Sequence, residues 1–168
     1  MTLKQLAGAA VLAAVATGAA ADSKFEHFGS VEGWNVFIDH EKNSCMIESI
    51  DSLENVVQMG LTKERDVAYL GVFTKAETSI KKDDKQAVAI LIGSNLYTGE
   101  VTGMRGNITK GYTGGYVLTD DPQFVEDLAK QYEMIVFPET SYSFIMDLSG
   151  TYKAIEMGRE CNQKVLAN

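Results

Sequence analysis

Apolar and polar residues alternate along several short stretches of this chain, which is the pattern of β-strands that bury one face. In Trp34–Asp39, for example, Trp34, Val36 and Ile38 share one face and alternate with Asn35, Phe37 and Asp39 on the other. Strands of this kind are expected at Trp34–Asp39, Ser44–Ile50, Val56–Thr62, Leu96–Val101, Gly115–Thr119, Glu133–Phe137 and Tyr142–Leu148.

Two further stretches, Val67–Thr74 and Ala87–Ile92, are apolar at nearly every position. Strands of this kind lie inside a sheet with both faces covered, so both are expected to be fully buried. Their length and flanking polar segments favour strands over helices.

Two helices are expected beside these strands. The first begins at Asp121-Pro122, an aspartate cap followed by proline in the first turn, and reaches about Gln131. The second follows Ser149 and places Ala154, Gly158 and Cys161 on one side, with a tail from Asn162. The predicted fold class is mainly β with an α+β fringe: an antiparallel β-sandwich-like domain with two peripheral helices.

The first 21 residues have the features of a cleaved secretory signal. Lys4 precedes an apolar run, Leu6–Ala16, and small residues end the segment, so cleavage is expected after Ala21. The run is shorter than the roughly 20 residues that span a bilayer, so no transmembrane segment is expected in the mature chain. Residues 22–168 are then a single β-rich domain, periplasmic or secreted, with Asp22–Ser30 loosely held at its start.

The charge of the chain is strongly acidic. It carries 23 acidic and 15 basic residues, for a net charge of −8, and loss of the segment containing Lys4 would make this −9. Such a surface repels the phosphate backbone, and no basic stripe offsets the repulsion, so nucleic acid is not an expected partner.

The chain contains two cysteines, Cys45 and Cys161. Two cysteines in an exported protein usually form one disulfide, which here would fasten the last helix to an early strand. A reactive thiol and a metal thiolate are the alternatives, and neither has the expected neighbours in sequence.

Catalytic chemistry has few candidate residues. His27 lies in the expected loose N-terminus, and His40 lies in a turn beside Asp39 and Glu41, whose alternating directions suit a metal poorly. A nucleophile elbow, a phosphate-binding loop and CxxC are absent, so no catalytic residue, cofactor or metal is expected. A hydrolase or thiol enzyme using Cys45 or His40 remains an alternative.

The segment from Tyr97 to Tyr116 is rich in glycine, with tyrosines and an arginine between the glycines. Tyrosine and arginine supply rigid contact area and hydrogen bonds, so Tyr97, Arg105, Tyr112 and Tyr116 are a candidate recognition surface. The alternative is that these residues belong to hairpin tips and edge strands whose tyrosines pack on the sheet.

The order of elements resembles the invasion-associated locus B family of exported bacterial proteins. The resemblance rests on Trp34 and Val36, on Cys45, on the two buried strands, on the helix and strand at Pro122–Phe137, and above all on the ending Phe144–Ile155 with Cys161. It covers nearly the whole mature chain with diffuse motifs. It implies a β-dominated, sandwich-like domain in or beyond the periplasm of a Gram-negative bacterium, with no known catalytic residues.

The function expected from these features is non-catalytic: an exported protein of the bacterial envelope that binds a partner, with an envelope or surface protein as that partner. A small-ligand carrier is a further alternative, with the ligand held between the sheet and the closing helix.

Overall fold

The computed structural model describes residues 24–63, 67–78, 81, 85–105, 111–138 and 140–167. The expected signal segment lies outside these residues. Within them are ten strands and two helices: β1 (Phe25–Val31), β2 (Trp34–Asp39), β3 (Ser44–Ile50), β4 (Val56–Leu61), β5 (Ala68–Thr74), β6 (Lys85–Ile92), β7 (Asn95–Arg105), β8 (Thr113–Thr119), α1 (Pro122–Lys130), β9 (Glu133–Val136), β10 (Phe144–Asp147) and α2 (Thr151–Ala167).

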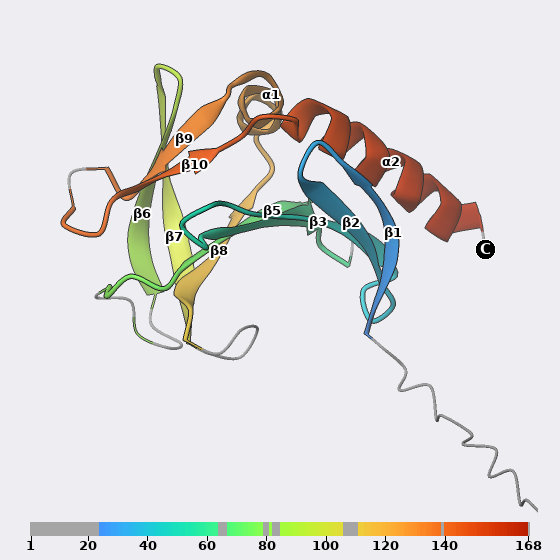
Figure 1. The fold of residues 1–168 in the computed structure, drawn as a ribbon, viewed down its shortest axis with the longest axis horizontal. Helices are drawn as coiled ribbons and strands as arrows, with labels where there is room; N and C mark the ends of the chain where they lie inside the picture. The colour runs from blue at the N-terminus through green and yellow to red at the C-terminus, as the bar shows by residue number, and fades with distance from the viewer. Residues whose placement is uncertain are drawn as a thin grey trace, which may run out of the picture.

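The strands form one continuous antiparallel sheet in the order β1-β2-β3-β4-β5-β8-β7-β6-β9-β10. Figure 1 shows this sheet bent into a trough, with β1 to β3 on one side, β6, β9 and β10 on the other, and the helices across the open side. The prediction of a mainly antiparallel, sandwich-like β-domain with two helices is confirmed. The two halves are parts of one sheet, joined through the β5–β8 and β7–β8 ladders.

One core fills the trough. Alternate residues of the strands point into it, as the two-residue period of a strand requires. Its most deeply buried side chains come from both halves of the sheet: Trp34, Val36, Val57, Leu70, Val72, Ile90, Ile92, Met134, Met146 and Leu148.

The two strands expected to be fully buried behave differently. In β5, every residue from Tyr69 to Thr74 is buried, as expected for a strand in the middle of a sheet. In β6, Val88, Ile90 and Ile92 face the core, whereas Ala87 is exposed and Leu91 is only half-buried. The expectation for β6 was therefore wrong, because no described element covers the outer face of this half of the sheet.

The N-terminal segment is more ordered than the sequence suggested. Phe25–Val31 forms the edge strand β1, which pairs with β2 from Phe25↔Asp39 to Val31↔Trp34. The ring of His27 packs edge-on against Phe37, at 5.5 Å between centroids. The prediction of a loose segment through Ser30 was therefore wrong from Phe25 onward. The polar composition of the segment suggested a loop, but its backbone groups are hydrogen-bonded to β2.

The closing helix α2 follows Ser149 as expected but ends later than predicted. Gly150, at φ +83°, precedes its first residue, Thr151, whose hydroxyl donates to the carbonyl of Leu148 at 2.5 Å. The helix continues to Ala167, so the expected tail from Asn162 is helical. Neither glycine nor proline follows Cys161, so no residue there marks the end of a helix.

Candidate functional site: two surfaces and an apolar hollow

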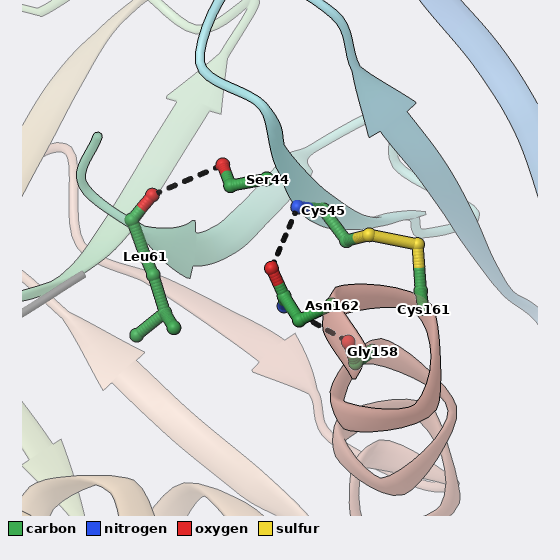
Figure 2. The surroundings of a disulfide bond; sticks show 6 residues. All are labelled: Ser44, Cys45, Leu61, Gly158, Cys161 and Asn162. Carbon is green, nitrogen blue, oxygen red and sulfur yellow. Dashed lines mark hydrogen bonds between the residues drawn. A yellow bond between two sulfur atoms is a disulfide. The ribbon is translucent and has the colours of Figure 1, made fainter. Parts of the chain in front are cut away.

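A disulfide joins the closing helix to the third strand. Cys45 of β3 and Cys161 of α2 are bonded, with their Cα atoms 6.1 Å apart and both side chains buried. Figure 2 shows Asn162 beside this bond, where its side-chain oxygen accepts from the backbone N–H of Cys45 at 3.1 Å and its amide donates to the carbonyl of Gly158 at 2.9 Å. The start of β3 is thus hydrogen-bonded to the helix as well as covalently attached to it.

The same helix approaches the sheet closely at Gly158. A Cβ atom at this position would lie 2.6 Å from Cδ1 of Ile47, which is closer than van der Waals contact allows. Together with the buried Ala154, this small residue lets the helix backbone lie against β3. Helix α2 is therefore held against β3 from Ala154 to Asn162.

Both residues suggested for enzyme chemistry are engaged elsewhere. Cys45 is disulfide-bonded, so in this state it offers no thiolate nucleophile. The His40 ring lies 3.1 Å from the carboxylate of Glu26 on the exposed β1–β2 edge. No cluster of three or more potential metal-binding His, Cys, Asp or Glu residues occurs in the described part of the chain.

Tyr97 lies on the face of the sheet that α1 covers. Its ring packs edge-on against Phe124 at 4.8 Å, and its hydroxyl donates to Asp127 at 2.5 Å. Burial and the Asp127 carboxylate raise the pKa of Tyr97 to about 12. Asp127 also accepts from Asn95 at 2.7 Å and from Gln123 at 2.8 Å, and these three donors lower its pKa below the ordinary value. Tyr97 therefore helps to hold α1 on the sheet.

Tyr116 lies on the opposite, outer face. Its ring packs edge-on against Phe73 at 5.3 Å and Tyr69 at 5.6 Å, and its hydroxyl donates to Gln58 at 2.6 Å. Burial, with the negative charges of nearby acidic residues, raises its pKa to about 12. The ring lies over Gly71, where a Cβ atom would be 2.4 Å from Cε1 of Tyr116.

Tyr112 belongs with Tyr116, in a small outer-face cluster with Val56 and Phe73. It is 8% exposed. Arg105 pairs through its backbone with Thr113 at the end of β7, and its side chain lies outside the described structure. Of the four residues of the predicted recognition surface, the structure thus brings Tyr112 and Tyr116 together and places Tyr97 on the other side of the sheet.

The structure also shows an apolar surface that the sequence did not predict. Four aliphatic residues lie side by side on the outer face of adjacent strands: Ile145 pairs with Ile135, Ile135 with Leu91, and Leu91 with Leu96. We call these four residues the aliphatic row. Ile145 and Leu96 are 55% and 60% exposed, and the middle two are half-buried. β6 and β7 are consecutive in sequence, as are β9 and β10. The long-range pairing of β6 with β9 joins the two halves of the row.

An apolar hollow lies on the inner side, between the sheet and both helices. It has a volume of about 230 Å³. Ile47 and Met59 of the sheet, Phe124 and Leu128 of α1, and Ile155 and Gly158 of α2 form its lining, beside Cys45 of the disulfide. Among the described residues, Arg159 is the one charged residue that lines it.

The fold and these surfaces define a class: an antiparallel β-domain closed by a disulfide-anchored helix. No protein-family model matches the sequence, and no curated protein matches it. Its fold is similar to that of the crystal structure of invasion associated protein b from Bartonella henselae, with a TM-score of 0.51 and 10% identity, over 83% of this chain and 95% of that one. At this identity the similarity shows the fold alone. No helix in the described part of the chain is long and apolar enough to cross a membrane.

Proposed function

We propose that this protein is an exported, non-catalytic binding protein of the bacterial envelope that captures a protein partner. The observation that carries the proposal is the aliphatic row. Its residues contribute to the outer face, while their strand neighbours Met146, Val136 and Ile90 fill the core. The row therefore exposes apolar area that the inner core does not require.

An exposed set of aliphatic side chains in register differs from single apolar residues scattered over a surface. Scattered residues are normal, whereas contiguous apolar area marks a site of association. The row also reaches β10, which is an edge strand of the sheet. An edge strand presents unpaired backbone groups, which a partner strand or loop can use. Apolar contact and backbone pairing are thus available at one place.

Export is supported by the disulfide and by the fold. Disulfides persist in oxidising compartments such as the periplasm, and a bond between Cys45 and Cys161 would be out of place in a reducing cytosol. The similar structure is that of a protein named for invasion. Similar folds host unrelated functions, so a role in host entry is not carried over to this chain.

The predicted recognition surface at Tyr97, Arg105, Tyr112 and Tyr116 is the weaker proposal for the same function. Tyr112 and Tyr116 already use their rings and the Tyr116 hydroxyl in contacts within the sheet. They have less exposed area to offer a partner than Ile145 and Leu96 do.

The test compares two double variants by chemical cross-linking in the native periplasm. Leu96→Asp/Ile145→Asp places two charges in the aliphatic row. Leu53→Asp/Leu166→Asp is the matched control, because these leucines are 74% and 66% exposed and lie outside the row. We expect the cross-linked species of the wild type to persist in the control and to be lost in the row variant. Equal cross-linking by both folded variants would refute the proposed surface.

A small-ligand carrier is the second candidate function. The observation that favours it is the apolar hollow beside the disulfide, at the place between the sheet and the closing helix where a carrier would hold its ligand. An enzyme using Cys45 is disfavoured while the disulfide is intact.

A further inference from the structure

The hollow between the sheet and the helices has a closed inner end and an accessible rim. Ile47, Met59, Phe124 and Leu128 are buried and form the inner end. At the rim, Leu61, Ala68 and Thr119 lie side by side, because Ala68 of β5 pairs with both of the others. All three are partly exposed. A molecule can therefore reach the apolar interior past the ends of β4, β5 and β8.

The volume of the hollow limits what it can hold. At about 230 Å³ it exceeds the roughly 150 Å³ cavity that accommodates benzene, and it is smaller than the 300 Å³ or more of a typical drug-sized pocket. One aromatic ring or a short alkyl chain is the size of group that fits. The lining is almost wholly apolar, so this group must be a hydrocarbon.

The polar side chains of Asn162 and Arg159 at the hollow differ in the strength of the contacts that they already make. Asn162 is committed at both ends, to the backbone of Cys45 and of Gly158. The Arg159 side chain is 64% exposed, and its ion pair with Glu156 is 3.7 Å long. Such an exposed pair contributes little, so the guanidinium can exchange it for a ligand carboxylate, which it would bind through two hydrogen bonds.

Arg159 also lines a second groove, which is formed by residues of both α1 and α2. The groove and the hollow share Val125, Ile155 and Arg159, and the groove adds Tyr152 and Lys130. Lys130 is paired with Glu126. Because the Arg159 side chain is 64% exposed, its positive charge lies between the apolar hollow and solvent, where the head of an amphipathic molecule would lie.

We infer that the hollow is a binding site for a small amphipathic carboxylic acid, with its single ring or short alkyl chain between the sheet and the helices and its carboxylate on Arg159. This goes beyond partner binding and uses residues outside the aliphatic row. Because the net charge of the chain is −8, an anion must be held by local contacts with Arg159 and by burial of its apolar part.

The experiment titrates the oxidised, full mature protein with octanoate, octan-1-ol and octylammonium, followed by the backbone amide signals of the lining residues in NMR spectra. We expect saturable shifts with octanoate, and binding of octan-1-ol that is roughly three- to tenfold weaker, the size of one exposed charge-assisted contact. Octylammonium should bind no better than octan-1-ol.

Three variants separate the two parts of the site. Arg159→Gln should reduce octanoate affinity to that of octan-1-ol, whereas Lys164→Gln, which removes a positive charge from the same helix outside the hollow, should not. Ala68→Phe should fill the rim and abolish binding of both ligands. Val125→Phe repeats this test from the α1 side if Ala68→Phe fails to fold.

The inference is overturned if octanoate causes no saturable shift, if filling the hollow leaves binding unchanged, or if Arg159→Gln and Lys164→Gln have equal effects. None of these outcomes bears on the aliphatic row. Conversely, loss of cross-linking in the row variant with octanoate binding intact would support both sites as independent.

Discussion

Breaking the Cys45–Cys161 disulfide should remove a large part of the stability of this protein. The bond closes a loop with a sequence separation of 116 residues. In the chain-entropy model, its main effect is to restrict the unfolded chain, and a loop of this length corresponds to about 4.9 kcal/mol at 25 °C. Domains of this size are stable by only about 5–15 kcal/mol, so the reduced protein should be marginally folded.

The contacts of α2 decide whether the native structure survives reduction. The helix keeps its close packing at Gly158, and Asn162 keeps its hydrogen bond to β3. The indole N–H of Trp34 also donates to the carbonyl of Ser149, just before the helix, at 2.8 Å. We therefore expect a reduced protein that still folds at 25 °C and unfolds in a single transition, with its melting temperature lower by about 10–20 °C.

Trp34 provides the assay, because it is the only tryptophan in the chain and is 1% exposed. Urea unfolding followed by its fluorescence would be measured for the oxidised and the reduced wild type, which have the same side chains. Cys45→Ala/Cys161→Ala is the control that cannot reoxidise. The further decrease in its free energy of unfolding, relative to the reduced wild type, measures the packing of the two sulfur atoms.

The reasoning fails if reduction lowers the free energy of unfolding by less than about 2 kcal/mol, the lower end of typical disulfide effects. It also fails if Trp34 fluorescence changes in a separate, earlier transition. That result would mean that the disulfide acts by keeping α2 docked and not by restricting the unfolded chain.

Two further predictions concern the helices. Gly158→Ala should lower the free energy of unfolding by about 1 kcal/mol, because overpacking against Ile47 outweighs the gain in helix propensity. Adding Ile47→Val to this variant should recover part of the loss. A higher urea midpoint for Gly158→Ala than for the wild type would contradict this reasoning. Asp127→Asn should lower the melting temperature at pH 7. The folded-state pKa of Asp127 is depressed, so its contribution is complete above the unfolded value of about 3.9 and is lost as the pH falls through the lower folded value. The gap between wild type and variant should therefore narrow at about pH 3, and a gap that is constant from pH 7 to pH 3 would show that the charge of Asp127 is not what matters.

The parts of the fold that could be predicted from the sequence are those set by local pattern. The alternation in Trp34–Asp39 located β2, and Asp121-Pro122 located the start of α1, where the Asp121 side chain accepts from the N–H of Gln123 at 2.9 Å. The edge strand β1 was missed because its apolar residues are few and interrupted by a bulge between His27 and Gly29. Only the partner strand reveals it.

The candidate surfaces depended on strand order, which the sequence pattern does not contain. Tyr97 and Tyr116 are near each other in the chain and both lie beside glycines, which suggested one surface. The fold separates them, because Tyr97 faces α1 and Tyr116 faces outward. Leu91 and Ile145 are 54 positions apart by their numbers, yet both flank Ile135 in the sheet.

The position of the helices explains why the two candidate sites lie where they do. Both α1 and α2 cover the inner side of the bent sheet (Figure 1), and the disulfide fixes α2 over β3. A side chain on the inner side is therefore in the core or at the hollow. In the described part of the chain, no such layer lies above the outer side of β6, β9 and β10. Leu91 and Ile145 can gain burial from a second molecule, whereas Arg159, on the helix that closes the hollow, can act on a ligand within one chain. The two sites are consequently separable by mutation.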